Sequence, residues 1–194
     1  MGLPHFRSSR VSMEMWEPMY QNLFYVTIQL PEGVTTSADD MNLILEGVTK
    51  VGGLITTVVP GATTSQKYKF ATRRFADSGP QSTTLDLSLS FELNIRNSKS
   101  GNPDAYTLKM LRKWTDLIYD PLTGRQGLKV DYVAPQMVVV MHDKAGNPYW
   151  QWTCYNVFPM QSLPDPGLDF SKNNGIYKVD DFKMACDYWD EVML

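Results

Sequence analysis

Apolar and polar residues alternate along several stretches of the chain, and a period of two is typical of strands that bury one face. The clearest stretch is "TTLDLSLSFELNI", residues 83–95. One face is apolar at every position, with Leu85, Leu87, Leu89, Phe91, Leu93 and Ile95. The other face is polar at every position, with Thr84, Asp86, Ser88, Ser90, Glu92 and Asn94. We therefore expect a strand that packs one side on a core and turns the other side to water.

Other stretches favour strands through the same alternation or through many β-branched and aromatic residues. They are residues 22–30, 128–133, 136–143, 149–160 and 181–190, and a further apolar segment covers 41–51. The sequence "DKAGNP" at 143–148 predicts a tight hairpin turn, which makes its neighbouring strands antiparallel.

The last of these stretches, "DFKMACDYWD", brings two aromatic residues to the end of the chain. The alternation places Phe182, Met184, Cys186 and Tyr188 on one face, where we expect them to close the fold against residues 149–158. Trp189 then lies on the opposite face with Asp187, and an exposed indole there suits a contact with another subunit.

One segment predicts a helix, at about residues 103–119. Asn102 can cap it, Pro103 suits the first helical position and Pro121 stops it. Its apolar stripe consists of Leu108, Leu111, Trp114, Leu117 and Ile118. We take Trp114 as a core anchor.

Residues 54–75, rich in Thr and Val, hold too few apolar residues for a core and predict a long hairpin arm that needs a partner surface. The fold class is thus mainly β: an antiparallel β-barrel or sandwich with one flanking α-helix and a long hairpin arm. Residues 1–21 form an N-terminal extension, and residues 22–194 form the barrel domain.

Composition and charge exclude several classes of protein. The 194 residues suit one domain, and the net charge of −3 lacks the basic excess that sequence-independent nucleic-acid binding needs. The longest wholly apolar run, residues 137–141, is far shorter than the ~20 residues of a membrane helix, so we expect no membrane anchoring. The first twenty residues lack a secretory signal, which favours the cytoplasm. Cys154 and Cys186 are then expected as buried free thiols, and a cross-strand disulfide stays open.

Candidate chemistry is sparse. His5 and His142 have no nucleophile motif beside them, and no phosphate-binding glycine loop occurs. Residues 165–175 carry acidic and amide oxygens, but their spacing departs from a calcium loop. We expect no enzyme activity, no cofactor and no metal.

The order of several segments carries a resemblance to a known family. They are "NLFYVTI" at 22–28, "FELNI" at 91–95, "LRKWTDLI" at 111–118, "YNVFPM" at 155–160 and "DFKMACDYW" at 181–189. Together they resemble the tail tube protein of contractile-tailed bacteriophages, a family related in fold to the type VI secretion tube protein. Phe182, Met184, Asp187, Tyr188 and Trp189 match the family's closing strand, although Met184 stands where a β-branched residue is more usual.

The resemblance implies a structural virion protein. Six subunits would form a ring, and stacked rings would make a hollow tube inside a contractile sheath, the conduit for genome ejection. The implied partners are copies of the chain itself, the tail sheath, baseplate and tail-terminator proteins, with the tape measure protein and DNA passing through the lumen without specific binding. The implied location is the tail tube of the virion, with the host cytoplasm during assembly. Two alternatives stay open: a tube protein of a bacterial contractile secretion or injection system, and a monomeric ligand-binding β-barrel.

Strand geometry agrees with such a ring. Six subunits that contribute about four strands each give ~24 strands, which at ~4.8 Å spacing and ~40° tilt close a ring roughly 48 Å across the backbone. Side chains leave a wet lumen of about 40 Å or less, which admits a DNA duplex.

Two sets of residues are candidates for function in such a tube. Asp86, Ser88, Ser90 and Glu92 are expected to face the lumen, where acidic side chains would keep DNA from sticking. The alternative is an ordinary solvated outer face. The candidate contacts between subunits are Lys67, Lys69, Arg73, Arg74, Asp187 and Trp189. Here the basic arm would meet the acidic C-terminal region of a neighbour, and the alternative is a solvated hairpin within one chain.

Overall fold

The computed structural model describes residues 19–34, 47–54, 63–76, 84–93, 95–97, 103–163 and 177–194. Several predictions concern residues outside these ranges. They are the N-terminal extension up to residue 18 with His5, the segment 41–46, the first part of the arm up to residue 62, Asn94, Asn102 and the loop 165–175.

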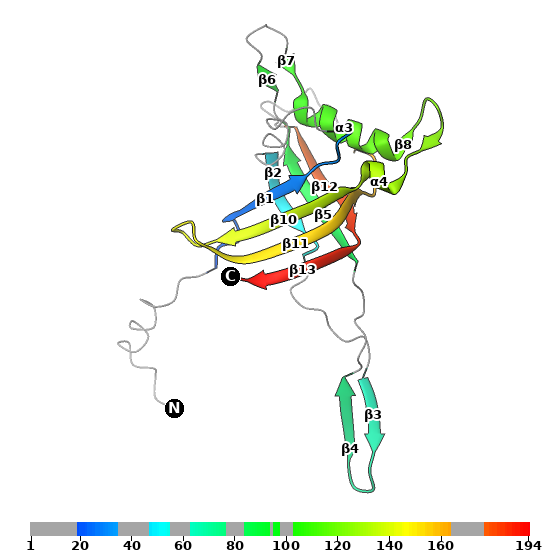
Figure 1. The fold of residues 1–194 in the computed structure, drawn as a ribbon. Coiled ribbons are helices and arrows are strands. Elements are labelled where there is room, and N and C mark those ends of the chain that lie inside the picture. Colours follow the sequence, from blue (N-terminus) through cyan, green and yellow to red (C-terminus); the bar gives the residue numbers. More distant parts are fainter. Residues whose placement is uncertain are drawn as a thin grey trace, which may run out of the picture.

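The described chain is mainly β, which confirms the predicted fold class (Figure 1). The elements are β1 (Phe24–Gln29), β2 (Val48–Gly52), β3 (Thr63–Lys67), β4 (Thr72–Ala76), β5 (Leu85–Glu92), β6 (Arg96–Asn97), β7 (Pro103–Asp104), α3 (Tyr106–Ile118), β8 (Tyr119–Asp120), β9 (Arg125–Gln126), α4 (Lys129–Tyr132), β10 (Ala134–His142), β11 (Pro148–Pro159), β12 (Lys178–Cys186) and β13 (Tyr188–Met193).

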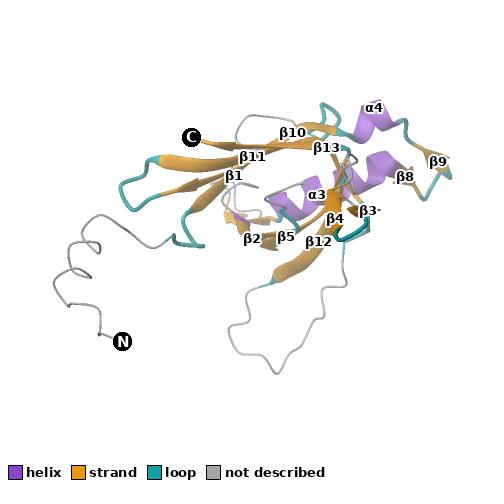
Figure 2. Cartoon of the chain, turned by 90° about the horizontal axis from the view of Figure 1, so that it is seen from below, coloured by secondary structure: helices purple, strands orange, loops and turns teal. Residues whose placement is uncertain are grey.

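Seven strands pair in the order β1-β10-β11-β12-β5-β2, and β13 also pairs with β11. Every pairing is antiparallel. Strand β11 belongs to two sheets, because its residues 150–155 pair with β13 and its residues 158–159 pair with β12. Between these parts lies Asn156, whose φ of 55° kinks the strand. We call β1-β10-β11-β13 the first sheet and β12-β5-β2 the second sheet (Figure 2).

The core lies between the two sheets and beneath α3. Leu85, Leu87, Leu89 and Phe91 of β5 are all buried, as the alternation predicts. From the first sheet come Val26, Ile28, Met137, Val139, Trp152 and Cys154. Helix α3 adds Met110, Leu111 and Trp114. The Trp114 indole N–H donates to the carbonyl oxygen of Tyr132 at 2.7 Å, so the predicted core anchor also ties α3 to α4.

The helix begins three residues later than predicted. Pro103 and Asp104 form β7, which pairs with Arg96 and Asn97 of β6, and an extended backbone in that pairing cannot also be helical. The first helical residue is therefore Tyr106. The helix ends at Ile118, close to the predicted stop before Pro121.

The predicted strand at 128–133 is wrong, because residues 129–132 form the single helical turn α4. The N–H of Val133 donates to the carbonyl of Lys129 at 3.1 Å, which closes that turn. No neighbouring strand among the described residues pairs with this segment, and Val130 is 76% exposed. Apolar alternation over six residues was too short to distinguish a strand from a turn of helix.

The predicted C-terminal strand is two strands in two sheets. Phe182, Met184 and Cys186 are buried as predicted, but their strand β12 pairs mainly with β5. After a bend at Asp187 the chain crosses to the first sheet, where β13 pairs with β11. The bend reverses the faces, so Tyr188 is 54% exposed and Trp189 packs against the core. Both face assignments for these aromatics are thereby corrected.

The arm, described here for residues 63–76, is a hairpin of β3 and β4 that projects away from the two sheets (Figure 1). Its turn is closed by the N–H of Tyr68, which donates to the carbonyl of Ala71 at 2.7 Å. All side chains described from residue 65 to residue 75 are exposed. The arm therefore has no core of its own, as the composition predicts.

Candidate functional site

The outward face of the second sheet is polar, but it is not purely acidic. Asp86 is exposed, and Ser88 and Glu92 are half-buried. The strand register adds lysines that the reading of β5 alone missed: Lys183 lies opposite Ser88, Lys178 opposite Glu92 and Lys50 opposite Ser90. Lys178 and Lys183 alternate with buried residues in β12, so for these two the sequence held the signal once the pairing was known.

Lys178 and Glu92 form an ion pair on this face, with the ammonium nitrogen 2.6 Å from the carboxylate Oε1. The hydrogen bond and the charge of Glu92 raise the pKa of Lys178. A raised lysine pKa means that the pair stabilises the fold at pH values below the ordinary lysine range and loses this contribution as the pH rises above it. Lys178 therefore stays charged around neutral pH.

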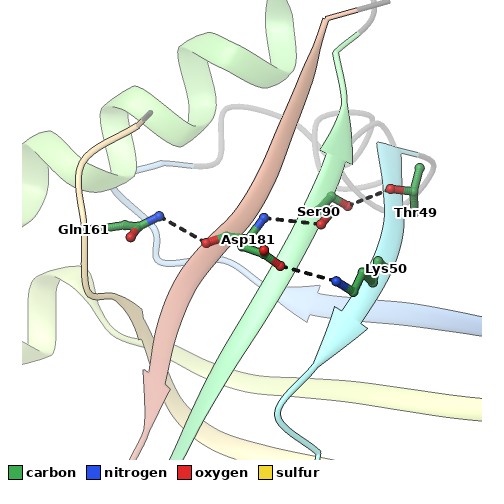
Figure 3. A network of polar contacts seen from close by, with 5 residues as sticks. All are labelled: Thr49, Lys50, Ser90, Gln161 and Asp181. Carbon is green, nitrogen blue, oxygen red and sulfur yellow. Dashed lines mark hydrogen bonds and ion pairs between the residues drawn. The ribbon is translucent and has the colours of Figure 1, made fainter. Parts of the chain in front are cut away.

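Ser90 departs from the predicted solvent-facing pattern, since it is only 5% exposed. Its hydroxyl oxygen accepts a hydrogen bond from the backbone N–H of Asp181 at 3.3 Å, and its carbonyl accepts one from the Thr49 hydroxyl at 3.3 Å. Figure 3 shows these contacts bridging β2, β5 and β12. Ser90 therefore links β5 to its two neighbouring strands by hydrogen bonds and is not exposed to solvent.

Asp181 is the centre of the same network. Its φ of 52° is in the left-handed region, and it lies where the β12–β5 register shifts between Val179 and Phe182. Its carbonyl accepts from the Gln161 amide at 3.2 Å, and its carboxylate lies 3.5 Å from the Lys50 ammonium (Figure 3). Three contacts hold a bulge that a non-glycine residue adopts only at a cost.

The four basic candidates lie together on the arm. Lys67, Lys69, Arg73 and Arg74 are all exposed, and residues 63–76 contain no Asp or Glu. The Lys69 ammonium lies 5.5 Å from the Phe70 ring centre, and the Arg73 guanidinium lies 5.7 Å from that of Tyr68. Phe70, which is not among the predicted contact residues, is 91% exposed at the turn. The arm thus ends in an aromatic and basic tip.

The two C-terminal candidates have partners within the chain. The Asp187 carboxylate forms an ion pair with the Lys129 ammonium of α4. Trp189 lies directly across from Cys154 and packs against the core. The structure therefore separates these two residues from the basic arm, and a contact between them would need a second copy.

The outward face of the first sheet was not recognised from the sequence. It is the face opposite the core residues and holds Tyr25, Thr27, Gln29, Gln136, Val138, Val140, His142, Gln151, Thr153, Tyr155, Tyr188, Asp190 and Val192. Its rings pair, with Tyr155 on Tyr188 at 5.5 Å and Tyr25 on His142 at 4.7 Å between ring centres. Few charges and several tyrosines are typical of protein interfaces.

Three strands have one neighbour each in the part of the chain that the structure describes. There β1 pairs with β10 alone, β2 with β5 alone and β13 with β11 alone, so one edge of each strand is open. Beside the β1 and β2 edges lies a groove of about 400 Å³ lined mainly by apolar side chains, including Phe24, Met141 and Trp152. Unpaired edges next to apolar surface are sites where another strand or chain can add.

A second groove of about 330 Å³ lies between the C-terminal end of α3, β8 and the residues after β11. Its lining residues are Thr115, Asp116, Ile118, Tyr119, Pro121, Pro159, Met160, Gln161 and Ser162. We call it the α3 groove. Met160 is 54% exposed there, and the side chain of Leu122, next to Pro121, is almost fully exposed.

The two cysteines are buried free thiols, as predicted. Hydrogen bonding to Cys186 and burial raise the pKa of the Cys154 thiol. Within the described residues, no group of three or more His, Cys, Asp or Glu could hold a metal ion. No helix in the described part of the chain is long and apolar enough to cross a membrane.

No family model matches the sequence, and no curated protein matches it either. Several solved structures do share its fold. A chain of the anti-feeding prophage cap, described as the tube terminating cap, superposes with a TM-score of 0.55 at 15% identity, covering 92% of this chain and 93% of that one. The chain has a tail-tube-like fold.

Two chains of an extracellular contractile injection system, PVC, agree with this. One comes from its sheath-tube complex, with a TM-score of 0.51, 15% identity and coverage of 96% and 98%. The other comes from its sheath/tube terminator, with a TM-score of 0.52, 15% identity and coverage of 91% and 98%. The tail-tube-like fold therefore accounts for nearly the whole chain, and at this identity the likeness concerns the fold.

Proposed function

We propose that the chain is a structural subunit of the inner tube of a contractile apparatus, in which six-membered rings stack into a hollow tube. The observation that carries the proposal is the likeness of fold, over more than nine-tenths of each chain, to chains from a tube terminating cap and a sheath-tube complex. The role is structural and not enzymatic.

The open edges and the first-sheet face support assembly into rings. Within the described residues, β1, β2 and β13 each have a neighbour on one edge alone, and the backbone groups of the other edge favour association. The tyrosine-rich face of the first sheet has the composition of an interface. We propose that these surfaces join neighbours within a ring.

The polar face of the second sheet supports a channel wall. Asp86, Ser88 and Glu92 would face the lumen with Lys50, Lys178 and Lys183 between them. Ser90 is buried, so it would stabilise the sheet that forms the wall and would not line the lumen. Alternating charges keep such a wall hydrated without a large field of one sign, so cargo would pass without specific binding.

The arm supports contact between rings, because its basic and aromatic side chains are exposed on a hairpin that leaves the body of the subunit (Figure 1). Lys67, Lys69, Arg73 and Arg74 would set orientation, and apolar burial would supply most of the affinity. The partners would be other copies of this chain, the sheath, the baseplate and a terminator.

We propose a phage tail as the setting, with the tape measure protein and DNA passing through the lumen and the protein located in the virion. A tube of an injection system is the second candidate, favoured by the injection-system origin of the compared structures. Extraction of particles from producing cells separates the two, since DNA protected inside the particle supports the first and its absence with protein cargo supports the second.

A monomeric ligand-binding barrel is a further candidate, and the apolar groove of about 400 Å³ beside β1 is the observation in its favour. Negative-stain electron microscopy of the purified protein tests it against the tube. Rings or tubes support the tube proposal. Particles of one 22.1 kDa chain at every concentration would contradict it.

A further inference from the structure

The tip of the arm and the α3 groove lie at opposite ends of the subunit. Strands β5 and β12 run between these two ends in Figure 1. Rings stacked along this direction would bring the tip of one subunit near the α3 groove of a subunit in the next ring. Such a head-to-tail contact repeats without limit, as a tube requires.

Hydrogen bonds within the hairpin fix the conformation of the tip without a partner. Phe70 is 91% exposed, the turn is closed by the Tyr68 and Ala71 backbone bonds, and the Tyr68 hydroxyl donates to the Gln66 amide oxygen at 2.8 Å. Lys69 lies beside the Phe70 ring. A fixed turn with an aromatic anchor loses little conformational entropy on binding.

The α3 groove is complementary to this tip in polarity. Most of its lining is apolar or neutral, with Met160, Pro121 and Pro159 among the apolar residues, and Asp116 is its one charged residue. The last turn of α3 has no basic residue, so no cationic side chain of the helix itself offsets the negative end of the helix dipole. The groove therefore offers apolar surface for a ring and a negative rim for an ammonium group.

A second carboxylate strengthens the negative rim. Asp120 follows the helix and accepts hydrogen bonds from the Leu122 N–H at 2.9 Å and the Thr123 hydroxyl at 2.6 Å. These bonds, first the one from Thr123, lower the pKa of Asp120. It remains a carboxylate through the physiological range.

Resting on the proposed function, we propose that the arm of each subunit inserts Phe70 into the α3 groove of a second copy in the next ring, with Lys69 beside Asp116. The contact is heterologous, so it stacks rings and does not close them. Other occupants of the groove, such as sheath or terminator segments, would take its place only at the end of the tube.

The test compares matched variants of the full chain by electron microscopy and sedimentation. Met160→Lys places a cation in the groove against the basic tip, and Val130→Lys makes the same change on an exposed apolar residue of α4 outside it. Phe70→Ser removes the anchor. We expect Met160→Lys and Phe70→Ser to form single rings with the ring-to-ring association constant reduced roughly 30-fold or more, while Val130→Lys forms tubes like the unchanged protein.

Exchange of the charges at positions 69 and 116 tests whether shorter tubes result from the lost contact and not from misfolding. Lys69→Glu should shorten the tubes, and addition of Asp116→Lys should restore their length, because the pair is then attractive in the reverse sense. A lysine near the end of α3 suits the helix dipole, so Asp116→Lys leaves the subunit stable. In a Phe70→Cys, Met160→Cys double variant, a short bis-maleimide should link copies of different rings through two thioether bonds.

The outcomes separate the inference from the proposed function. Tubes of normal length in Met160→Lys and Phe70→Ser, without crosslinks in the double cysteine variant, would overturn the inference and leave the tube proposal standing. Failure of the unchanged protein to form rings or tubes at any concentration would overturn both.

Discussion

The backbone N–H of Asp181 donates a hydrogen bond to the Ser90 hydroxyl oxygen at 3.3 Å across 91 residues of sequence. This bond fixes the bulge of β12 against the centre of β5, and a partly buried N–H is costly to leave without an acceptor. The second sheet therefore takes its register partly from a serine that alternation alone would place in water.

Ser90→Ala should lower the free energy of unfolding by about 1–2 kcal/mol, because the Asp181 N–H loses its acceptor. Urea denaturation measures the change. Ser88→Ala on the same face, which is half-buried, is the matched control and should cost about 0.5 kcal/mol or less. Equal losses in the two variants would mean that the Ser90 hydroxyl has no special role.

Asp181→Gly and Asp181→Val separate backbone strain from charge. Both remove the carboxylate, whose ion pair with the largely exposed Lys50 contributes little. Glycine adopts a φ of 52° freely, whereas a β-branched residue does not, so Val should be less stable than Gly by about 1–3 kcal/mol in thermal or urea unfolding. Similar stability of the two variants would argue against strain at this position.

Removal of the hairpin should leave the subunit folded but unable to stack. Thr63 and Ala76 are paired, so the two ends of the deleted segment lie side by side and two glycines can join them in place of residues 63–76. The melting temperature should change little, since the arm adds no residue to the core cluster. Electron microscopy should show rings without tubes, and long tubes from this variant would refute the role of the arm.

The two cysteines should resist alkylation in the folded protein. Hydrogen bonding to Cys186 and burial raise the pKa of Cys154, so its thiolate is scarce at pH 8, and both side chains are inaccessible. Iodoacetamide at pH 8 should modify both only after denaturation, and mass spectrometry counts the additions. Rapid labelling of the native protein would contradict this burial.

Reversal of charge at Asp86 should affect passage through the tube and not its assembly. Asp86→Lys changes the wall by about +12 charges per ring of six, and a polyanion would then be retained, with release slowed on the order of tenfold. The Glu92 and Lys178 pair stays intact in this variant. Asp131→Lys on α4 is the control, and unchanged release kinetics in Asp86→Lys would argue against a lumenal position.

Long, regular alternation made the core of the fold predictable. Leu85 to Phe91 are buried at every second position, and the hairpin turn at 143–148 joins β10 to β11 as expected. The wrong face assignments of the C-terminal aromatics occur where a backbone bend reverses the faces. Asp187 is such a place, and no local pattern marks it, because the bend depends on the crossing of the chain from one sheet to the other.

The sequence predicted that one face of β5 is polar, but it did not predict which residues of other strands share that face. The polar residues of β5 were visible, yet Lys50, Lys178 and Lys183 joined them only through strand pairing over long sequence distances. The α3 groove had no sequence signal, since Asp116 and Met160 come from separate elements. Exposed Phe70 was hidden among basic residues, and its importance depends on the hairpin turn that presents it.

Among the described strands, β11 is the one that both sheets share, and this has a mechanical consequence. In the proposed tube, a pull on the arm would reach the second sheet, and a pull between neighbours in a ring would reach β1 and β13. These two forces meet in residues 150–159, on either side of Asn156. When a sheath contracts and drives a tube forward, the corner at Asn156 is where axial thrust and hoop tension would be exchanged within each subunit.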